Sequence, residues 1–183
     1  MSLTLPGELE VLRDLSKRFD DAGIAYMLTG SLAMSFYATP RMTRDIDVVA
    51  ELESSDVGRI VALFESDYYV SREAVAEAVR DRSSFNLIEQ DSVTKVDVFP
   101  RKRDDFREAE FARRRRVTIG DFTTWIVTAE DLLLAKLLWA RLSRSDIQIR
   151  DIRALLDAPL DREYVEMWVH RLALDALWHE VQP

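Results

Sequence analysis

Cysteine is absent from this chain, and histidine occurs only at His170 and His179. The missing thiols exclude a disulfide framework and thiolate chemistry. With only two histidines, both near the C-terminus, a zinc site and a Ser-His-Asp triad are disfavoured. The longest apolar candidate, residues 132–142, is too short to span a bilayer and contains Lys136 and Arg141. No secretory leader is visible, so we expect a soluble, cytoplasmic protein without a membrane partner.

Positive charge is in the minority, because 25 Lys and Arg residues stand against 33 Asp and Glu residues and leave a net charge of −8. A surface dominated by nucleic-acid binding is therefore not expected. Residues 101–116 are a local exception, with eight basic and four acidic side chains. Two interpretations of this segment stay open: a solvated helix and turn, or a patch that meets a polyanion such as nucleotide phosphates or tRNA.

Apolar spacing predicts alternating helices and strands in the first two thirds of the chain and helices alone afterwards. An apolar content of 48% over 183 residues suffices for one compact domain, with or without a helical extension. We expect residues 1–127 to form a core and residues 128–183 a helical extension packed on it. The predicted fold class is α+β, with a mixed sheet of the α/β type and a C-terminal helical bundle.

The individual elements follow from the same spacing and from turn residues. The predicted strands are 24–29, 45–49, 84–88, 94–99, 116–119 and 123–127. The predicted helices are 9–19, 31–38, 57–64, 74–79, 104–112, 132–142, 146–156 and 161–178.

Three aspartates carry the clearest chemical signal. Asp45 and Asp47 are two residues apart in a predicted strand, so their side chains share one face while Ile46 and Val48 take the other. Like charges side by side repel, and such a pair indicates a cation between them. An isolated aspartate is disfavoured within a strand, so we expect Asp97 to lie beside the first two. Surface acids on a wet sheet face are the alternative.

Gly30 and Ser31 form a predicted strand-to-helix turn before these aspartates. A glycine at such a turn lets the backbone approach a ligand closely. The free N–H groups at the start of the following helix attract anions, and phosphate is their natural guest. A Gly-Ser turn is a weak signal alone and a stronger one shortly before an aspartate pair.

Taken together, these motifs resemble those of the polymerase-beta-like nucleotidyltransferases. More narrowly, they are similar to a small bacterial group related to abortive-infection nucleotidyltransferase toxins and antibiotic nucleotidyltransferases. The shared pattern is a Gly-Ser turn, a strand with two aspartates and a later strand with one, here Gly30-Ser31, Asp45-Ile46-Asp47 and Asp97. Residues 40–44, 130–137 and 150–152 match further runs of the group. The resemblance covers residues 26–178 and implies the nucleotidyltransferase fold.

The resemblance implies a nucleotidyltransferase that moves an NMP group from an NTP to an acceptor hydroxyl and releases pyrophosphate. Asp45, Asp47 and Asp97 are then the ligands of Mg²⁺, or of Mn²⁺ in its place, and Asp97 also serves as the base. The expected NTP-binding residues are Gly30, Ser31, Arg41, Thr43, Lys136 and Asp151.

Lys136 is one of only four lysines and emerges from an apolar helix face. A buried ammonium needs an anionic partner. Three interpretations stay open: a contact with the triphosphate, as the resemblance implies, a pair with Asp151 on the next helix, or extension of the side chain to solvent.

The acceptor is not specified by the sequence. An aminoglycoside or lincosamide hydroxyl, the end of a tRNA and a protein side chain all stay open, as do the preferred NTP and the oligomeric state. The alternative function is a non-catalytic nucleotide- or partner-binding protein on the same fold, for example a toxin–antitoxin component with a cognate antitoxin. A hydrolase that uses water as the acceptor is the third possibility.

Four tryptophans are expected in the core. Trp139, Trp168 and Trp178 occur at helical positions beside leucines. Trp125 lies in a strand of alternating pattern, where stacking on a base is the alternative.

Overall fold

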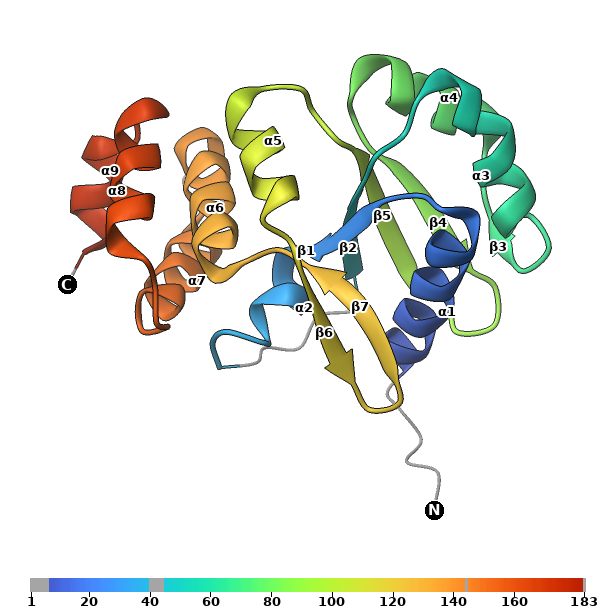
Figure 1. Cartoon of the computed structure of the whole chain (residues 1–183), viewed down its shortest axis with the longest axis horizontal. Coiled ribbons are helices and arrows are strands. Elements are labelled where there is room, and N and C mark those ends of the chain that lie inside the picture. The colour runs from blue at the N-terminus through green and yellow to red at the C-terminus, as the bar shows by residue number, and fades with distance from the viewer. Residues whose placement is uncertain (1–6, 40–44, 144, 183) are drawn as a thin grey trace.

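The computed structural model describes residues 7–39, 45–143 and 145–182. Its strands are β1 (Tyr26–Thr29), β2 (Asp45–Ala50), β3 (Tyr68–Tyr69), β4 (Phe85–Glu89), β5 (Lys95–Pro100), β6 (Arg115–Ile119) and β7 (Phe122–Ile126). They form one sheet in the order β3-β4-β5-β2-β1-β7-β6 (Figure 1). β2 is parallel to β5 and antiparallel to β1, and β1 is parallel to β7. The sheet is therefore mixed, as predicted.

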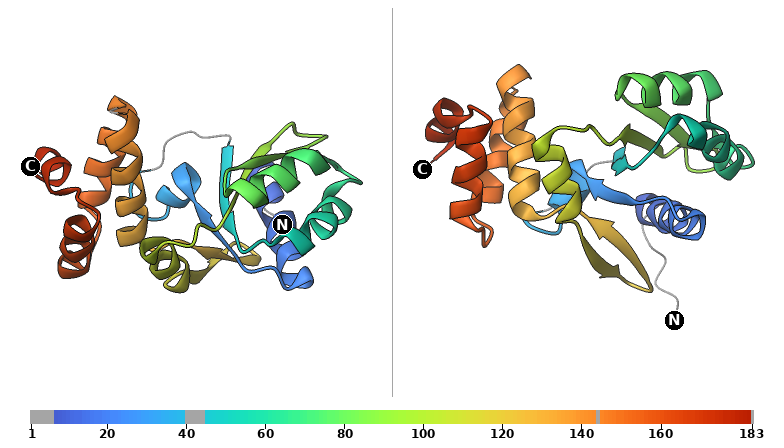
Figure 2. Two further views of the ribbon diagram at one scale, coloured as in Figure 1. Left: turned by 90° about the horizontal axis from the view of Figure 1, so that it is seen from above. Right: turned by 45° about the horizontal axis from the view of Figure 1, so that its top comes forward.

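Most of the helices lie in two groups at the ends of this sheet. The helices are α1 (Gly7–Ala22), α2 (Gly30–Met34), α3 (Val57–Phe64), α4 (Arg72–Asp81), α5 (Asp105–Ala112), α6 (Ala129–Ser143), α7 (Asp146–Leu156), α8 (Arg162–Arg171) and α9 (Asp175–Val181), with a 3₁₀ turn at Ser54–Asp56. Helices α6 to α9 stand together at one end, beside α5, while α3 and α4 lie at the other end (Figures 1 and 2). The predicted α+β class with a C-terminal helical bundle is confirmed.

One face of the central strands carries the hydrophobic core. Val48 of β2 is fully buried there, together with Leu12 and Phe19 of α1. The Phe19 ring lies 5.3 Å from the ring of Tyr26 and 5.7 Å from that of Phe64, so α1 and α3 pack together on β1. Because a slip of one residue would turn this apolar set outward, the buried face fixes the register of the strands.

The predicted boundary after residue 127 falls in the short link between β7 and α6. Buried apolar side chains on both sides of it, such as Leu28 and Leu133, belong to one continuous core. Helix α6 contacts α2, which begins directly after β1, and it also contacts the helices that follow it.

The predicted helix 161–178 is wrong, because two helices occupy that stretch. α8 ends at Arg171 and α9 begins at Asp175. Between them Ala173 has a φ of 53°, and the N–H groups of Ala173 and Leu174 donate to the carbonyls of His170 and Val169. This is a Schellman motif with alanine in the left-handed position that glycine usually takes, so the sequence contains no turn residue to mark it.

Other differences are smaller. The predicted helix 31–38 is shorter, since α2 ends at Met34 and turns follow, and the two-residue β3 was not predicted. Trp168 and Trp178 are buried as expected, but the prediction for Trp139 is wrong because that residue is 55% exposed. Most of the circumference of α6 is buried, and Trp139 occupies the narrow face that remains. Trp125 is half-buried.

A buried carboxylate joins the helical extension to the rest of the molecule. Asp131, in the first turn of α6, is fully buried and accepts hydrogen bonds from the Tyr164 hydroxyl (2.6 Å), the Thr128 hydroxyl (2.7 Å) and Nε of Arg113 (3.1 Å). The Thr128 hydroxyl in turn accepts the backbone N–H of Asp131. Burial raises the pKa of Tyr164, and the bond to Asp131 raises it further, so the phenol stays a donor. These bonds tie α6 to α8 and to the segment before β6.

Replacing Asp131 by alanine (Asp131→Ala) should lower the free energy of unfolding by about 3 kcal/mol, because it leaves a guanidinium and two hydroxyls without their acceptor. Urea unfolding followed by circular dichroism measures the change. The control is Asp157→Ala, at an exposed position after α7, which should stay within about 0.5 kcal/mol of the wild type. Equal stability of the two variants would show that this network does not hold the helices.

Candidate active site

The pairing of β2 with β5 brings two of the three aspartates into direct register. Asp47 is the partner of Asp97 in this parallel pair, and Asp45 is the partner of Lys95. Partners on adjacent strands share a face, so all four side chains lie on the side of the sheet opposite Val48 and the core. Asp45 is largely exposed, whereas the side chain of Asp97 is 18% exposed. The expected placement of Asp97 beside Asp47 is therefore found.

Asp47 carries the electrostatic strain of this arrangement. Burial raises its pKa to about 6, and the negative charges of Asp97 and Asp45 push it in the same direction. The positive charges of Lys136 and Lys95 act against this shift. The net result is a carboxyl group that ionises less readily than an ordinary aspartate.

Gly30 is held against this aspartate. Its φ is +66°, a left-handed conformation that suits glycine. A Cβ added to Gly30 would lie 2.0 Å from Oδ2 of Asp47, which leaves no room for a side chain. The chain thus leaves β1 at Thr29, the strand partner of Asp47, and crosses close over the carboxylate as it enters α2. Ser31 follows as the second residue of α2 and is half-buried.

Lys95 was not predicted as a site residue. Its Nζ lies 2.9 Å from Oδ2 of Asp97 and 3.9 Å from Oδ1 of Asp45. The period of two in the strand places residues 95 and 97 on one face, so the signal was present in the sequence.

Lys136 and Asp151 form a buried ion pair. Nζ of Lys136 donates to Oδ2 of Asp151 at 2.8 Å, and both side chains are almost completely buried. Of the three interpretations of Lys136, extension to solvent is wrong and the pair with Asp151 is present. The pair joins α6 to α7, and its ammonium acts on Asp47 as described above. Arg41 and Thr43, the other two predicted nucleotide ligands, lie outside the described residues.

The three carboxylates can be compared with the ligands that a metal ion prefers. Three carboxylates on one sheet face offer the hard oxygen ligands that Mg²⁺ and Mn²⁺ prefer. As the side chains stand, no group of three Asp, Glu or His residues in the described chain is close enough to hold a metal ion. The ammonium of Lys95 lies between Asp97 and Asp45 instead. The residues fit a divalent cation in donor type, and in this structure the Lys95 ammonium is the cation that pairs with two of the carboxylates.

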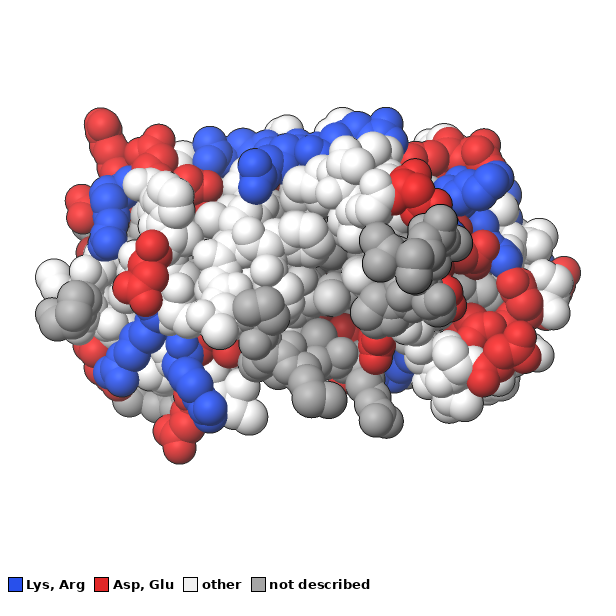
Figure 3. All heavy atoms as spheres, turned by 90° about the horizontal axis from the view of Figure 1, so that it is seen from below, with Lys and Arg blue, Asp and Glu red and all other residues white. Residues whose placement is uncertain are grey.

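The basic segment 101–116 is largely neutralised within the molecule. Basic side chains form a band along one edge of the face shown in Figure 3. Five of the eight in the segment pair with carboxylates: Arg101 with Glu51, Arg103 with Glu53, Arg107 with Glu110, Arg113 with Asp131 and Arg116 with Asp20. Two guanidinium groups, those of Arg114 and Arg116, also lie 4.9 and 5.4 Å from the Trp125 ring. The pairing favours the structural interpretation of the segment over a polyanion patch.

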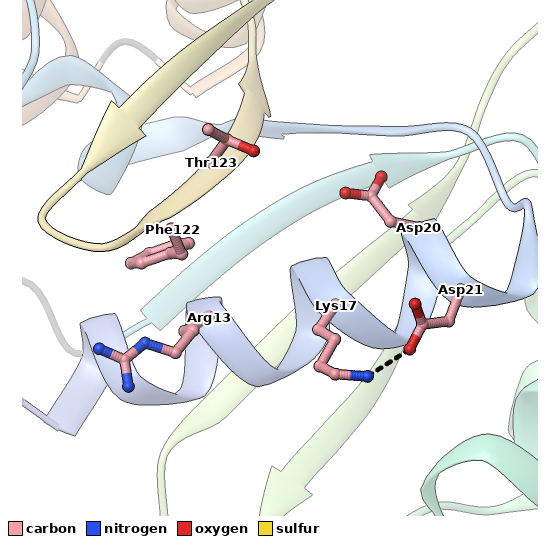
Figure 4. A pocket seen from close by; sticks show the side chains of 6 residues that line it. All are labelled: Arg13, Lys17, Asp20, Asp21, Phe122 and Thr123. Atoms are coloured by element: carbon pink, nitrogen blue, oxygen red, sulfur yellow. Dashed lines mark hydrogen bonds and ion pairs between the residues drawn. The ribbon is translucent and has the colours of Figure 1, made fainter.

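A shallow hollow of about 330 Å³ lies elsewhere, between α1 and β7. Figure 4 shows its lining: Arg13, Lys17, Asp20, Asp21, Phe122 and Thr123. It lies on the face of the sheet that α1 covers, opposite Asp47, and Lys17 pairs with Asp21 at its rim. The hollow is therefore not part of the carboxylate site.

Among the described helices, none combines the length and the apolar character needed to cross a membrane.

Replacing Asp47 by asparagine (Asp47→Asn) should raise the free energy of unfolding at pH 7.5, in a chelating buffer, by about 2 kcal/mol, because it removes a buried, repelled charge. The pKa of Asp47 is higher in the folded protein, about 6, than its ordinary value of 3.8. The wild type should therefore lose stability as the pH rises from about 4 to about 6, and the variant should lose less. Urea unfolding across this pH range measures both effects.

The control for that experiment is Asp45→Asn, because Asp45 is largely exposed and its replacement should change stability little. An Asp47→Asn variant less stable than the wild type at pH 7.5 would contradict the strain ascribed to Asp47.

Replacing Gly30 by alanine (Gly30→Ala) should lower the free energy of unfolding by more than about 1 kcal/mol, since the left-handed conformation alone costs about that much. The added methyl group would also push Asp47 aside. Gly58→Ala is the control, because Gly58 lies inside α3 and its Cβ would meet only the Arg72 guanidinium at 3.6 Å. That variant should be unchanged or more stable, and a Gly30→Ala variant that behaves likewise would refute the close contact.

No family model matches this chain, and no curated protein is significantly similar to it in sequence. Solved structures are similar to it in fold. The antibiotic-resistance factor ANT(2″)-Ia, solved in complex with adenylyl-2″-tobramycin, has a TM-score of 0.59 at 18% identity, over 93% of this chain and 98% of its own.

Two further solved structures are also similar to this chain in fold. The lincosamide antibiotic adenylyltransferase LnuA, solved with lincomycin bound, has a TM-score of 0.53 at 15% identity, over 85% of this chain and 99% of its own. An antigenic nucleotidyltransferase-like protein from Paracoccidioides brasiliensis has a TM-score of 0.53 at 19% identity, over 81% of this chain and 75% of its own. At such identities the likeness concerns the fold, and this chain has the nucleotidyltransferase fold that its motifs imply.

Proposed function

We propose that this chain transfers the nucleotidyl group of an NTP to a hydroxyl of an acceptor and releases pyrophosphate. The observation that carries the proposal is the direct register of Asp47 with Asp97, beside Asp45 and under the Gly30 turn. Structural neighbours that are adenylyltransferases support the same reaction class.

The proposed reaction is a displacement at the α-phosphorus. The acceptor oxygen bonds to the α-phosphorus, the bond from that atom to the oxygen of the β-phosphate breaks, and pyrophosphate leaves with the electron pair. Asp97 accepts the hydroxyl proton. Asp45, Asp47 and Asp97 are the residues that would hold a divalent cation, which would supply charge neutralisation and acidify the acceptor hydroxyl.

The remaining residues bind the triphosphate in this proposal. Gly30 leaves space because no side chain projects from the turn, and Gly30 and Ser31 present backbone N–H groups to the β and γ phosphates. Lys136 contributes positive charge from α6, held in place by Asp151. Arg41 and Thr43 complete the set. Catalysis then rests on positioning and electrostatics.

A small-molecule hydroxyl is the acceptor that the observations favour. Two structural neighbours were solved with an antibiotic or its adenylylated form. The internal pairing of residues 101–116 leaves less free positive charge for a tRNA acceptor than the sequence alone indicates.

The first experiment is a calorimetric titration of the four NTPs with Mg²⁺ into the wild type and into the Asp45→Ala/Asp47→Ala double variant. We expect Mg²⁺-dependent binding of at least one NTP by the wild type and none by the double variant. Transfer of label from that NTP to candidate hydroxyl acceptors then measures catalysis.

In the transfer assay, Asp47→Ala should reduce the rate by about 10³-fold or more, which corresponds to several kcal/mol of barrier. The Asp157→Ala variant, at an exposed position directly after α7, should keep the wild-type rate. Full activity of a folded Asp47→Ala protein would refute the assignment. NTP binding without transfer to any acceptor would favour a non-catalytic nucleotide-binding protein, and release of free NMP would indicate hydrolysis.

A further inference from the structure

One ammonium group bridges the two strands of the carboxylate site. Lys95 lies two residues before Asp97 on β5 and opposite Asp45 on β2. Its Nζ is 2.9 Å from Oδ2 of Asp97, a charge-assisted hydrogen bond, and 3.9 Å from Oδ1 of Asp45. The Lys95 ammonium therefore lies within ion-pair distance of both carboxylates.

The second ammonium near the site has a different partner. Lys136 is buried and donates to Asp151 at 2.8 Å. Its charge acts on Asp47 from α6, whereas Lys95 meets the carboxylates themselves. The two lysines are thus not equivalent, and Lys95 is the one in the position that a cation would take.

The surroundings of Lys95 allow it to leave. Its side chain is 39% exposed, and a lysine carries its charge on a flexible four-carbon stem. A divalent cation and an ammonium compete for the same carboxylate oxygens. A lone pair that accepts a hydrogen bond from the ammonium cannot coordinate the cation at the same time.

We propose that Lys95 is a positioning residue that holds Asp97 and Asp45 together in the nucleotide-free protein and competes with the divalent cation for their oxygens. The protein then binds the free cation weakly, and productive binding requires the ammonium to move aside, where triphosphate oxygens are its natural next partner. This inference rests on the proposed function, since it takes the aspartates as cation ligands.

Titration with Mn²⁺, followed through the electron paramagnetic resonance signal of the free ion, tests the proposal without nucleotide and without turnover. We expect Lys95→Met to bind Mn²⁺ about 10-fold more tightly than the wild type, the equivalent of about 1.4 kcal/mol. The matched control is Lys102→Met, which removes the same charge from an exposed position in the loop beyond the other end of β5. It should bind Mn²⁺ as the wild type does.

Thermal melting in a chelating buffer is the companion measurement. Lys95→Met should melt below the wild type, because its carboxylates lose their counter-charge, and Mn²⁺ should raise its melting temperature by more than it raises that of the wild type. A purely structural role of Lys95 would lower the melting temperature without tightening Mn²⁺ binding, and that outcome overturns the proposal.

The other outcomes separate this inference from the proposed function. Suppose that the wild type and Lys95→Met bind Mn²⁺ equally, and that Asp47→Asn abolishes binding in both. That outcome would overturn the role of Lys95 and leave the proposed metal site intact. Equal tightening in Lys102→Met would show a general charge effect and also overturn it. Mn²⁺ binding that is indifferent to Asp47→Asn would instead count against the proposed function itself.

Discussion

Like-charge repulsion between Asp47 and Asp97 is the constraint on which the rest of this structure depends. The two carboxylates are partners in a parallel strand pair, and this register keeps them side by side. They stay together because the opposite face of the same strands, with Ile46, Val48, Val96 and Val98, is fully buried. A slip of the register would relieve the charges and expose the core, so the apolar face holds the acidic one in place.

Two ammonium groups nearby offset that repulsion. Lys95 places an ammonium between the strands, and Lys136 adds a second charge from the helical extension. A buried pair such as Lys136 with Asp151 is weak evidence of stability, because desolvation offsets much of the attraction. The pair has a second consequence, because the charge of Lys136 lowers the pKa of Asp47 and Asp151 fixes the position of that charge. The hydrogen bonds of Asp131 attach α6 to Arg113 and to Tyr164 of α8. Because Lys136 also lies on α6, these bonds help to fix the position of its charge.

The sequence predicted the parts of the site that follow from local periodicity. A period of two places Asp45 with Asp47, and Gly30 marks the turn at which a side chain would collide with Asp47. Lys95 was missed although the same period of two places it on one face with Asp97. Other features could not be predicted, either because they depend on contacts between distant segments or because the residue is unusual for its conformation. The charge of residues 101–116 could not reveal that Glu51 and Glu53, fifty residues earlier, neutralise part of it. Ala173 ends a helix in a conformation that alanine rarely adopts, with buried Leu174 beside it. Trp139 is exposed because the leucines of α6 already fill the contact surface.

The same charges explain why a cation belongs to the proposed reaction. An NTP brings several negative charges to a site that already holds three carboxylates and that has raised the pKa of Asp47 to about 6. Lys95 is paired with Asp97 and Lys136 with Asp151, so a carboxylate already offsets much of the charge of each ammonium. Added positive charge is therefore a condition for bringing nucleotide and aspartates together, and it most readily arrives with the nucleotide. In the proposed reaction we therefore expect the site, strained in the free protein, to take up the nucleotide together with its counter-ion.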